Sequence, residues 1–448
     1  DINVNGPLSV GANSLKLTTG GAIVDGNATG NDLTASGLSL EGTGSIGTAA
    51  DPIETSASTL NLSSTGTGEI AVTEANGATL SSATTGSGQI KVVSTTGDLL
   101  VGTVSTSGDV TLTATAGDIL DATSAITGVT VNLMADGDIG VAATPIKTTA
   151  TTLNLTGTGN GEIAVTESDA VTLASATTGS GAIKVVSTTG DLTVGTVTTS
   201  KNITLTASDG AVLDDGTAAN ITSSGGTTSI TATGTGKNIG TAANPLDIDG
   251  PGGDVTLSAA GGAVHVNTVT AGSVEFTNST VGANVTTTFK QGGEIYSATY
   301  AANTDGHLTV RANGDILNSA GTTVQVPNAI LTLTSSAAAG SIGTAAKPVL
   351  TKAGTLNLTG AGTGEIAVTE SDGVTLASAT TGSGDIKVVS AAGNLSVGTV
   401  TTTGGVTLQA TAGAITDSNG ATNNVTAASL TASAGTGIDL DTTIGTLA

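Results

Sequence analysis

The sequence contains no cysteine and no tryptophan, and its 448 residues include only two tyrosines and two phenylalanines. A compact globular domain of this length normally has many more large side chains to fill a thick core. The shortage therefore argues against such a domain and favours a narrow interior. The absence of cysteine leaves the redox compartment open, and it is compatible with a chain that crosses an outer membrane unfolded, where a premature disulfide would block passage.

Basic residues are also scarce, because 11 Lys and Arg stand against 35 Asp and Glu, for a formal net charge of −24. A polyphosphate backbone or an anionic lipid surface needs a basic partner, so the composition excludes nucleic acid and argues against electrostatic attachment to membranes. No apolar run approaches the length of a membrane span, and no signal peptide is visible at Asp1. We therefore expect no direct membrane insertion.

Catalytic side chains are few. The chain has two histidines, His265 and His307, and a single arginine, Arg311. No Ser-His-Asp arrangement, phosphate-binding GxxxxGK[ST] or HExxH motif can be assembled from the sequence. Some β-helical proteins cleave polysaccharides, but they do so with clustered Asp, Lys or Arg, and here the basic residues are scattered. We expect a protein that is not an enzyme.

What the sequence does contain is repetition. A 64-residue block occurs three times without a gap, at residues 59–122, 152–215 and 355–418. Each copy carries TLNL, GEIAVTE, SATTGSG, IKVVS and VGTV in the same order. Self-similarity of this kind is typical of repeat architectures, in which each unit buries its apolar face by stacking on its neighbours.

A second phrase gives a longer period of about a hundred residues. IGTAADP, IGVAATP, IGTAANP and IGTAAKP begin at Ile46, Ile139, Ile239 and Ile342, and IGT returns at Ile444. The phrase predicts coils over 1–45 before the first marker, then module 1 (46–138), module 2 (139–238), a divergent module 3 (239–341), module 4 (342–443) and the start of a further module (444–448). We expect the ladder to continue beyond both ends of this sequence.

Within a module, apolar residues alternate with polar ones every second position, which predicts strands with one buried and one wet face. Gly-rich turns such as TGSG and TAGD separate the strands at intervals of about ten residues. Similar strands recur at about twenty, which predicts one coil. Two columns are expected, one of Ile70, Ile90 and Val110 and another of Leu60, Leu80 and Leu99. The predicted fold is all-β, a right-handed parallel β-solenoid of about twenty residues per coil that forms a single elongated rod, with two or three strands per coil.

The strands Gly108–Ala114 (GDVTLTA) and Asn202–Ala207 (NITLTA), together with the IGTAA phrases, resemble the repeat regions of filamentous-haemagglutinin-like exoproteins. The resemblance covers nearly the whole chain. It implies an extended β-helix that serves as an adhesin, stalk or fibre of a bacterium, exported by two-partner secretion. The Asn-Pro-Asn signatures of that family's secretion domain have no match here.

No cofactor is expected, although calcium is an alternative. Aspartate follows glycine repeatedly, and turn aspartates more often accept hydrogen bonds from their own backbone than bind metal. The GGxGxDxUx nonapeptide of calcium-binding β-rolls does not occur. The aspartates concerned are Asp98, Asp109, Asp118, Asp138, Asp191, Asp254, Asp315 and Asp385.

The best candidate for a contact surface lies in module 3, which lacks the 64-residue block. All aromatic residues of the chain fall there, and aromatic side chains with polar atoms commonly anchor protein and glycan contacts. The alternative interpretation is that the rings widen or fill the core locally. The candidate contact residues are Phe276, Phe289, Tyr296, Tyr300, His307 and Arg311.

Two functions follow from these patterns. The first is a structural and adhesive repeat protein that forms a rigid fibre or stalk, extracellular on a bacterial surface or as a secreted fibre. Its partners would be copies of itself, end to end or side by side, because an uncapped strand edge pairs with whatever continues the ladder. The alternative is an adhesin that binds host-cell or neighbouring-cell receptors or glycans through module 3 or through a tip outside this sequence.

Overall fold

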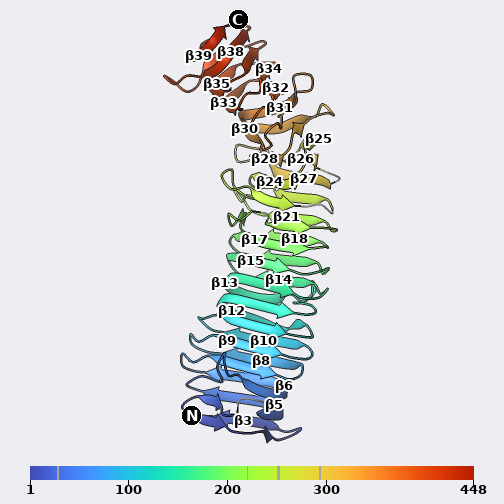
Figure 1. Ribbon diagram of the computed structural model, residues 1–448, viewed down its shortest axis with the longest axis vertical. Helices are drawn as coiled ribbons and strands as arrows, with labels where there is room; N and C mark the ends of the chain where they lie inside the picture. Colours follow the sequence, from blue (N-terminus) through green and yellow to red (C-terminus); the bar gives the residue numbers. More distant parts are fainter. Residues whose placement is uncertain (28–29, 219, 250–252, 292–293, 448) are drawn as a thin grey trace. The chain divides into compact units, whose positions relative to one another are not determined.

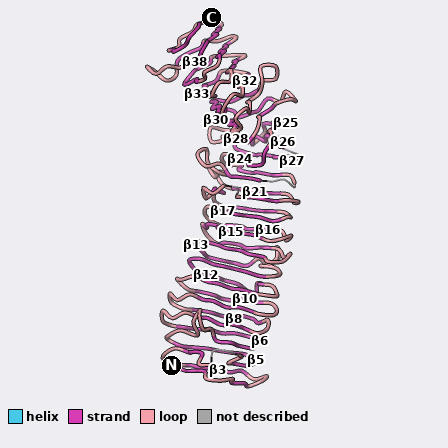
Figure 2. Tube along the Cα trace, viewed as in Figure 1, coloured by secondary structure: helices cyan, strands magenta, loops and turns pink. Residues whose placement is uncertain are grey.

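A computed structural model describes residues 1–27, 30–218, 220–249, 253–291 and 294–447. Within these residues the chain forms 39 strands joined by turns and bends, with no helix (Figures 1 and 2). The chain divides into two compact units, Asp1–Gly210 with Ser223–Gly226 and Ala211–Thr222 with Thr227–Ala448. The alternating residues of the sequence thus form strands, as predicted.

The first unit holds β1 to β18, coloured blue to green in Figure 1. Their bounds are β1 Ile2–Val4, β2 Leu8–Ser9, β3 Ser14–Thr18, β4 Ile23–Asp25, β5 Leu33–Gly42, β6 Ile53–Ser64, β7 Ile70–Glu74, β8 Ala78–Thr84, β9 Ile90–Ser94, β10 Leu99–Ser105, β11 Val110–Ala114, β12 Ile119–Ala135, β13 Ile146–Gly157, β14 Ile163–Glu167, β15 Val171–Thr177, β16 Ile183–Ser187, β17 Leu192–Thr199 and β18 Ile203–Ala207.

The second unit holds β19 to β39, apart from Ser223 at the end of β20. Their bounds are β19 Val212–Asp214, β20 Ile221–Ser223, β21 Thr228–Ala232, β22 Leu246–Asp249, β23 Val255–Ala259, β24 Val264–Ala271, β25 Val274–Val281, β26 Asn284–Gln291, β27 Glu294–Ala301, β28 Leu308–Asn313, β29 Ile316–Leu317, β30 Thr323–Ser335, β31 Val349–Gly360, β32 Ile366–Glu370, β33 Val374–Thr380, β34 Ile386–Ser390, β35 Leu395–Thr401, β36 Gly405–Ala410, β37 Ile415–Asp417, β38 Val425–Ala434 and β39 Thr442–Leu447.

Each strand of the repeated blocks pairs in parallel with its equivalent one coil later. Ile70 faces Ile90, Ile90 faces Val110 and Val110 faces Val131. These partners lie 20 or 21 residues apart along the sequence. The predicted parallel β-solenoid of about twenty residues per coil is therefore confirmed.

The second predicted column is wrong at its third member. Leu80 follows Leu60 as expected, but it faces Val101, whereas Leu99 faces Ala78. Both Leu99 and Val101 point inward, so alternation alone could not tell which of them shares a column with Leu80.

A coil contains two strands, and the longer one bends. In β10 the buried aliphatic side chains are Leu99, Val101 and Val104, so the alternation slips by one residue at Gly102. A Cβ at Gly102 would lie 2.4 Å from the carbonyl oxygen of Ser81 in the coil before it. Only glycine fits this close approach of two backbones, which explains the VGTV motif.

The IGTAA phrases form coils in which one strand shrinks to a single bridge. Ile46 bridges Ile23 on one side and Ile70 on the other, both in parallel, and the other three marker isoleucines bridge in the same way. The following Gly47 has φ +61°, in the left-handed region, and a Cβ there would lie 2.4 Å from the carbonyl oxygen of Ala71. Backbone geometry therefore explains why glycine follows the marker isoleucine in this phrase.

Module 3, which the sequence marks as divergent, departs locally from the predicted parallel pairing. Between β24 and β28, the strands β25, β26 and β27 form an antiparallel meander. β24 pairs in parallel with β28, so that Val264 faces Leu308, 44 residues later. An insertion of about one coil is thus accommodated without ending the parallel pairing of the strands on either side.

Candidate functional site

The four aromatic side chains lie in the core of module 3. Phe276, Phe289, Tyr296 and Tyr300 are at most 1% exposed. Phe289 faces Phe276 on one neighbouring strand and Tyr296 on the other, with ring centroids 6.0 Å and 5.0 Å apart. The structure corrects the contact interpretation for these rings, because a side chain without exposed surface cannot reach a partner. They fill the widened coil, as in the alternative interpretation.

The Tyr300 hydroxyl is bonded inside the protein as well. It lies 2.7 Å from the Thr287 hydroxyl oxygen and donates to the Gln325 carbonyl at 2.7 Å. Burial raises the pKa of Tyr300 above its ordinary value. The polar atom that made this residue a candidate anchor therefore joins β26, β27 and β30.

His307 and Arg311 are half-buried. His307 Nδ1 accepts a hydrogen bond from the Ile330 N–H at 3.1 Å, and the Arg311 guanidinium donates to the Ala242 carbonyl at 3.2 Å. His265 Nδ1 lies 2.6 Å from the Thr309 hydroxyl oxygen, and burial together with the positive charges of His307 and Arg311 lowers the pKa of His265 to about 4. These contacts tie neighbouring coils together.

The aspartates that follow glycine have a structural role, but with a partner other than the one predicted. Asp98 Oδ1 accepts a hydrogen bond from the Asp118 N–H at 3.0 Å, and Asp118 Oδ1 accepts one from Asp138 at 2.7 Å. The donor is thus the backbone of the next coil rather than the residue's own turn. The same bond from a later segment is made by Asp109, Asp138, Asp254, Asp315 and Asp385.

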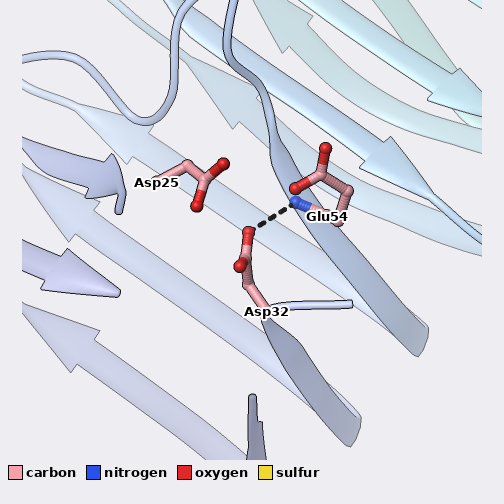
Figure 3. Close-up of side chains that lie close together, drawn as sticks. All are labelled: Asp25, Asp32 and Glu54. Atoms are coloured by element: carbon pink, nitrogen blue, oxygen red, sulfur yellow. Dashed lines mark hydrogen bonds between the residues drawn. The ribbon is translucent and has the colours of Figure 1, made fainter. Parts of the chain in front are cut away.

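Three carboxylates that the sequence did not single out meet at one corner of the first unit (Figure 3). Asp25 ends β4, Asp32 directly precedes β5 and Glu54 is the second residue of β6. One oxygen from each carboxylate lies within 4.8 Å of the others. Asp25 is 5% exposed and Asp32 is fully buried. We call Asp25, Asp32 and Glu54 the acidic corner.

Hydrogen bonds fix the acidic corner but leave part of it without a donor. Asp25 Oδ1 accepts from the Asn27 N–H at 2.8 Å, which forms a tight turn, and Asp32 Oδ2 accepts from the Glu54 N–H at 3.0 Å (Figure 3). Asp32 Oδ1 and Glu54 Oε2 are buried and have no hydrogen-bond partner, and the same is true of Asn27 Oδ1. Oxygen acceptors therefore gather where donors are missing.

The electrostatics of the acidic corner are unfavourable to three negative charges. Burial raises the pKa of Asp32. Burial and the nearby carboxylates of Asp32 and Asp25 raise the pKa of Glu54 to about 7. Like charges at this separation need a proton or a cation between them. The arrangement can therefore hold a hard cation through carboxylate oxygens.

A second set of acidic side chains is buried in every repeated block. Glu74, Glu167 and Glu370, which end the GEIAVTE motif, have no exposed surface, although polar residues of these strands are expected on the wet face. Glu74 Oε2 accepts from the Thr55 hydroxyl at 2.6 Å and from the Ala57 N–H at 3.0 Å. In β7 the inward positions are 70, 72 and 74, so alternation itself would have placed Glu74 inside.

The acidic corner was missed because its members are distant in sequence. Only the parallel register brings residues 32 and 54 side by side, since Leu33 faces Thr55. A usable signal does exist. An aspartate followed six or seven residues later by Asp or Asn and an aliphatic residue occurs at Asp25, Asp214 and Asp417, each time shortly before or within a marker coil.

In the part of the chain that the structure describes, no helix is long and apolar enough to cross a membrane. Comparison with known proteins gives no match for this chain, whether to a family model, a curated protein or a solved structure.

Proposed function

We propose that this chain is a structural repeat section of an extracellular fibre or stalk on a bacterial surface, of the filamentous-haemagglutinin-like type. The observation that carries the proposal is the repetition of one parallel register through the 64-residue blocks. β7 pairs with β9 as β14 pairs with β16 and β32 with β34, and the same residue types face each other. A sequence that repeats register in this way specifies length rather than a single pocket.

The chemistry of the described side chains supports the same proposal. The contacts of the histidines, the arginine and the turn aspartates join one coil to the next. The buried glutamates do so as well, because Glu74 of β7 holds Thr55 of β6. Polar groups that join one coil to the next are suited to a long, rigid stalk. The acidic surface would keep neighbouring fibres soluble and mutually repelling.

Immunogold labelling of producing cells tests the location and the form together. Antibodies to the chain should label filaments on intact cells, and cryo-electron microscopy of those filaments should show a stacking repeat of about 4.8 Å, the spacing between paired strands. Label that appears only after the cells are permeabilised would contradict the proposal.

A contact role for module 3 is a second candidate, carried by its antiparallel meander. Val281 ends β25 beside the turn to β26 and is 52% exposed, although the four rings nearby are buried. If this turn contacts a receptor or glycan, Val281→Ser should weaken adhesion of cells or beads that carry the chain. Val129→Ser is the matched control, because Val129 is 47% exposed in the first unit. Equal adhesion of both variants would argue against the contact role and leave the structural role as the one candidate.

A further inference from the structure

The corner that carries Asp25, Asp32 and Glu54 recurs elsewhere in the chain with different chemistry. Near the C-terminal end, Ile415 bridges Ile438 in parallel as Ile23 bridges Ile46. Asp417, two residues after Ile415, accepts from the Asn419 N–H at 2.7 Å, which is the same turn that Asp25 forms with Asn27. The two corners can therefore be compared position by position.

At the equivalent of Asp32 the later corner has an asparagine. Asn424 Oδ1 accepts from the Asp441 N–H at 2.8 Å, just as Asp32 Oδ2 accepts from the Glu54 N–H. The Asn424 amide nitrogen then donates to Asp417 Oδ1 at 2.8 Å. Asp32 has the same shape but has no N–H to donate, and it adds a negative charge.

Two other corners also supply a donor or a positive charge. Towards the end of module 2, Asn220 stands before β20 as Asp32 stands before β5, and its amide donates to Asp215 Oδ1 at 3.2 Å. In module 2, Lys147 stands at the position of Glu54, and its ammonium nitrogen lies 3.5 Å from Asp121 Oδ2. These three corners thus place an amide or an ammonium group beside an aspartate, whereas the first corner has the carboxylates of Asp32 and Glu54 at the equivalent positions.

We propose that the acidic corner binds one divalent cation of the calcium type, which takes the place of the amide or ammonium donor and joins β4, β5 and β6. The unpartnered oxygens of Asp32 and Glu54 point to a ligand that accepts only oxygen lone pairs. All side chains at the corner offer oxygen, with no imidazole or thiolate, which favours calcium over transition metals.

The spacing of the oxygens agrees with this choice. Oxygens bound to one calcium ion at about 2.4 Å lie at most about 4.8 Å apart, and the three carboxylates meet within 4.8 Å. Magnesium needs a tighter octahedron and keeps more of its water, so the irregular and largely buried set of Asp25, Asp32 and Glu54 suits it less well.

Calcium titration of the full chain by isothermal calorimetry, after treatment with a chelator and at pH 7.5 in 150 mM NaCl, tests the proposal. The unaltered chain should bind one equivalent of calcium that Asp32→Asn does not bind, or binds at least tenfold more weakly. Thermal unfolding should show a rise in Tm with calcium for the unaltered chain and no rise for Asp32→Asn. Asp209→Asn, which removes an exposed charge from the same unit, should behave like the unaltered chain.

A second variant keeps the test independent of how Asp32→Asn folds. Glu54→Lys introduces the lysine that stands at the equivalent position, Lys147, so the variant should fold. It should bind no calcium at this site, and its Tm should not change when calcium or a chelator is added. Equal calcium uptake by the unaltered chain, Asp32→Asn and Glu54→Lys would overturn the proposal. So would the absence of calcium binding by the unaltered chain, which would assign a proton to the corner. Equally tight magnesium binding would overturn the assignment to calcium.

Discussion

At the scale of single residues, buried polar side chains in this protein occupy fixed places and have fixed partners. Glu74, Glu167 and Glu370 each accept a hydrogen bond from a threonine hydroxyl 19 residues earlier, at 2.6 to 2.7 Å. Each also accepts one from a backbone N–H two residues after that threonine. A buried carboxylate without such donors would be strongly unfavourable, so glutamate, threonine and the strand end depend on one another.

Replacing Glu74 should therefore destabilise the first unit. Glu74→Ala leaves the Thr55 hydroxyl and the Ala57 N–H buried without an acceptor, which should cost about 3 kcal/mol. Glu74→Gln keeps the shape and one acceptor oxygen and should cost about 1 kcal/mol. The shift of the urea midpoint, followed by far-UV circular dichroism, measures the difference.

Glu69→Ala is the control for this prediction, because Glu69 is bonded at the surface by the Gln89 amide. Its loss should change stability by no more than about 0.5 kcal/mol. Equal midpoints for Glu74→Ala and Glu69→Ala would mean that the buried carboxylate does not hold β6 to β7.

The buried glutamates also predict a pH dependence. Burial raises the pKa of Glu370 to about 7 from an ordinary value of 4.5, against the opposing hydrogen bonds from Thr351 and Ala353. Between about pH 4.5 and pH 7 the folded form keeps a proton that the unfolded form has released, so this group lowers stability as the pH rises through that interval. Above pH 7 the loss is complete.

Thermal unfolding between pH 4.5 and pH 8, in the presence of a chelator, compares the unaltered chain with Glu370→Gln. The Tm of the unaltered chain should fall relative to that of the variant as the pH rises, and the difference should level off above pH 7. Parallel curves over the whole range would show that Glu370 titrates near its ordinary pKa in the folded protein.

At the scale of elements, the bend in the longer strand of each coil sets the cross-section. β10 changes direction at Gly102 and β35 does so at Gly398, each in a VGTV motif. In both places the glycine lies against a carbonyl oxygen of the preceding coil, at Ser81 and at Ala377. Each long strand thus consists of two straight segments joined at a bend, and each segment has its own inward face. A pattern that alternates along one straight strand does not predict this change of face.

Replacing the glycine at this bend by alanine should therefore destabilise the folded protein. The new Cβ of Gly102→Ala would lie 2.4 Å from the Ser81 carbonyl oxygen, and the backbone must move to relieve the overlap. We expect a loss of about 1 to 3 kcal/mol, measured as a lower urea midpoint. Gly6→Ala is the matched control, since nothing lies within 4 Å of its Cβ position. A neutral Gly102→Ala would mean that the two coils separate there easily.

Sequence reasoning predicted the elements of the repeated blocks because the same alternation recurs three times, so that each copy supports the others. It placed Ile70, Ile90 and Val110 in one column, as the structure does. It failed in module 3, where antiparallel β25 to β27 alternate just as parallel strands do. Direction of pairing and the meeting of Asp32 with Glu54 depend on contacts between distant residues, which a local pattern does not encode.

At the scale of the whole molecule, the charge is the dominant feature. The 35 acidic residues greatly outnumber the 11 basic ones, which can neutralise only part of the charge in pairs such as Lys16 with Glu41 at 2.8 Å. Most of the negative charge is therefore left to repel itself, which favours solubility and opposes compact packing.

Salt should consequently stabilise the protein. Raising KCl from about 10 mM to about 150 mM shortens the Debye length from about 30 Å to about 8 Å, which screens the repulsion among acidic residues. We expect the Tm in the presence of a chelator to rise over this range. A Tm that falls with salt would mean that the pairs between Lys and acidic residues contribute more to stability than the net repulsion takes away.

The shared register of the three blocks has a consequence for the gene. Thr59, Thr152 and Thr355 begin strand segments that occupy the same place in the coil, and the residues after them pair in the same way. Recombination between the DNA segments that encode two blocks would join one coil to an equivalent coil, with the columns of side chains in the blocks continuous across the joint. We therefore expect the protein to accept the gain or loss of whole modules without repacking, so that its length can change while the pairing of its coils stays the same.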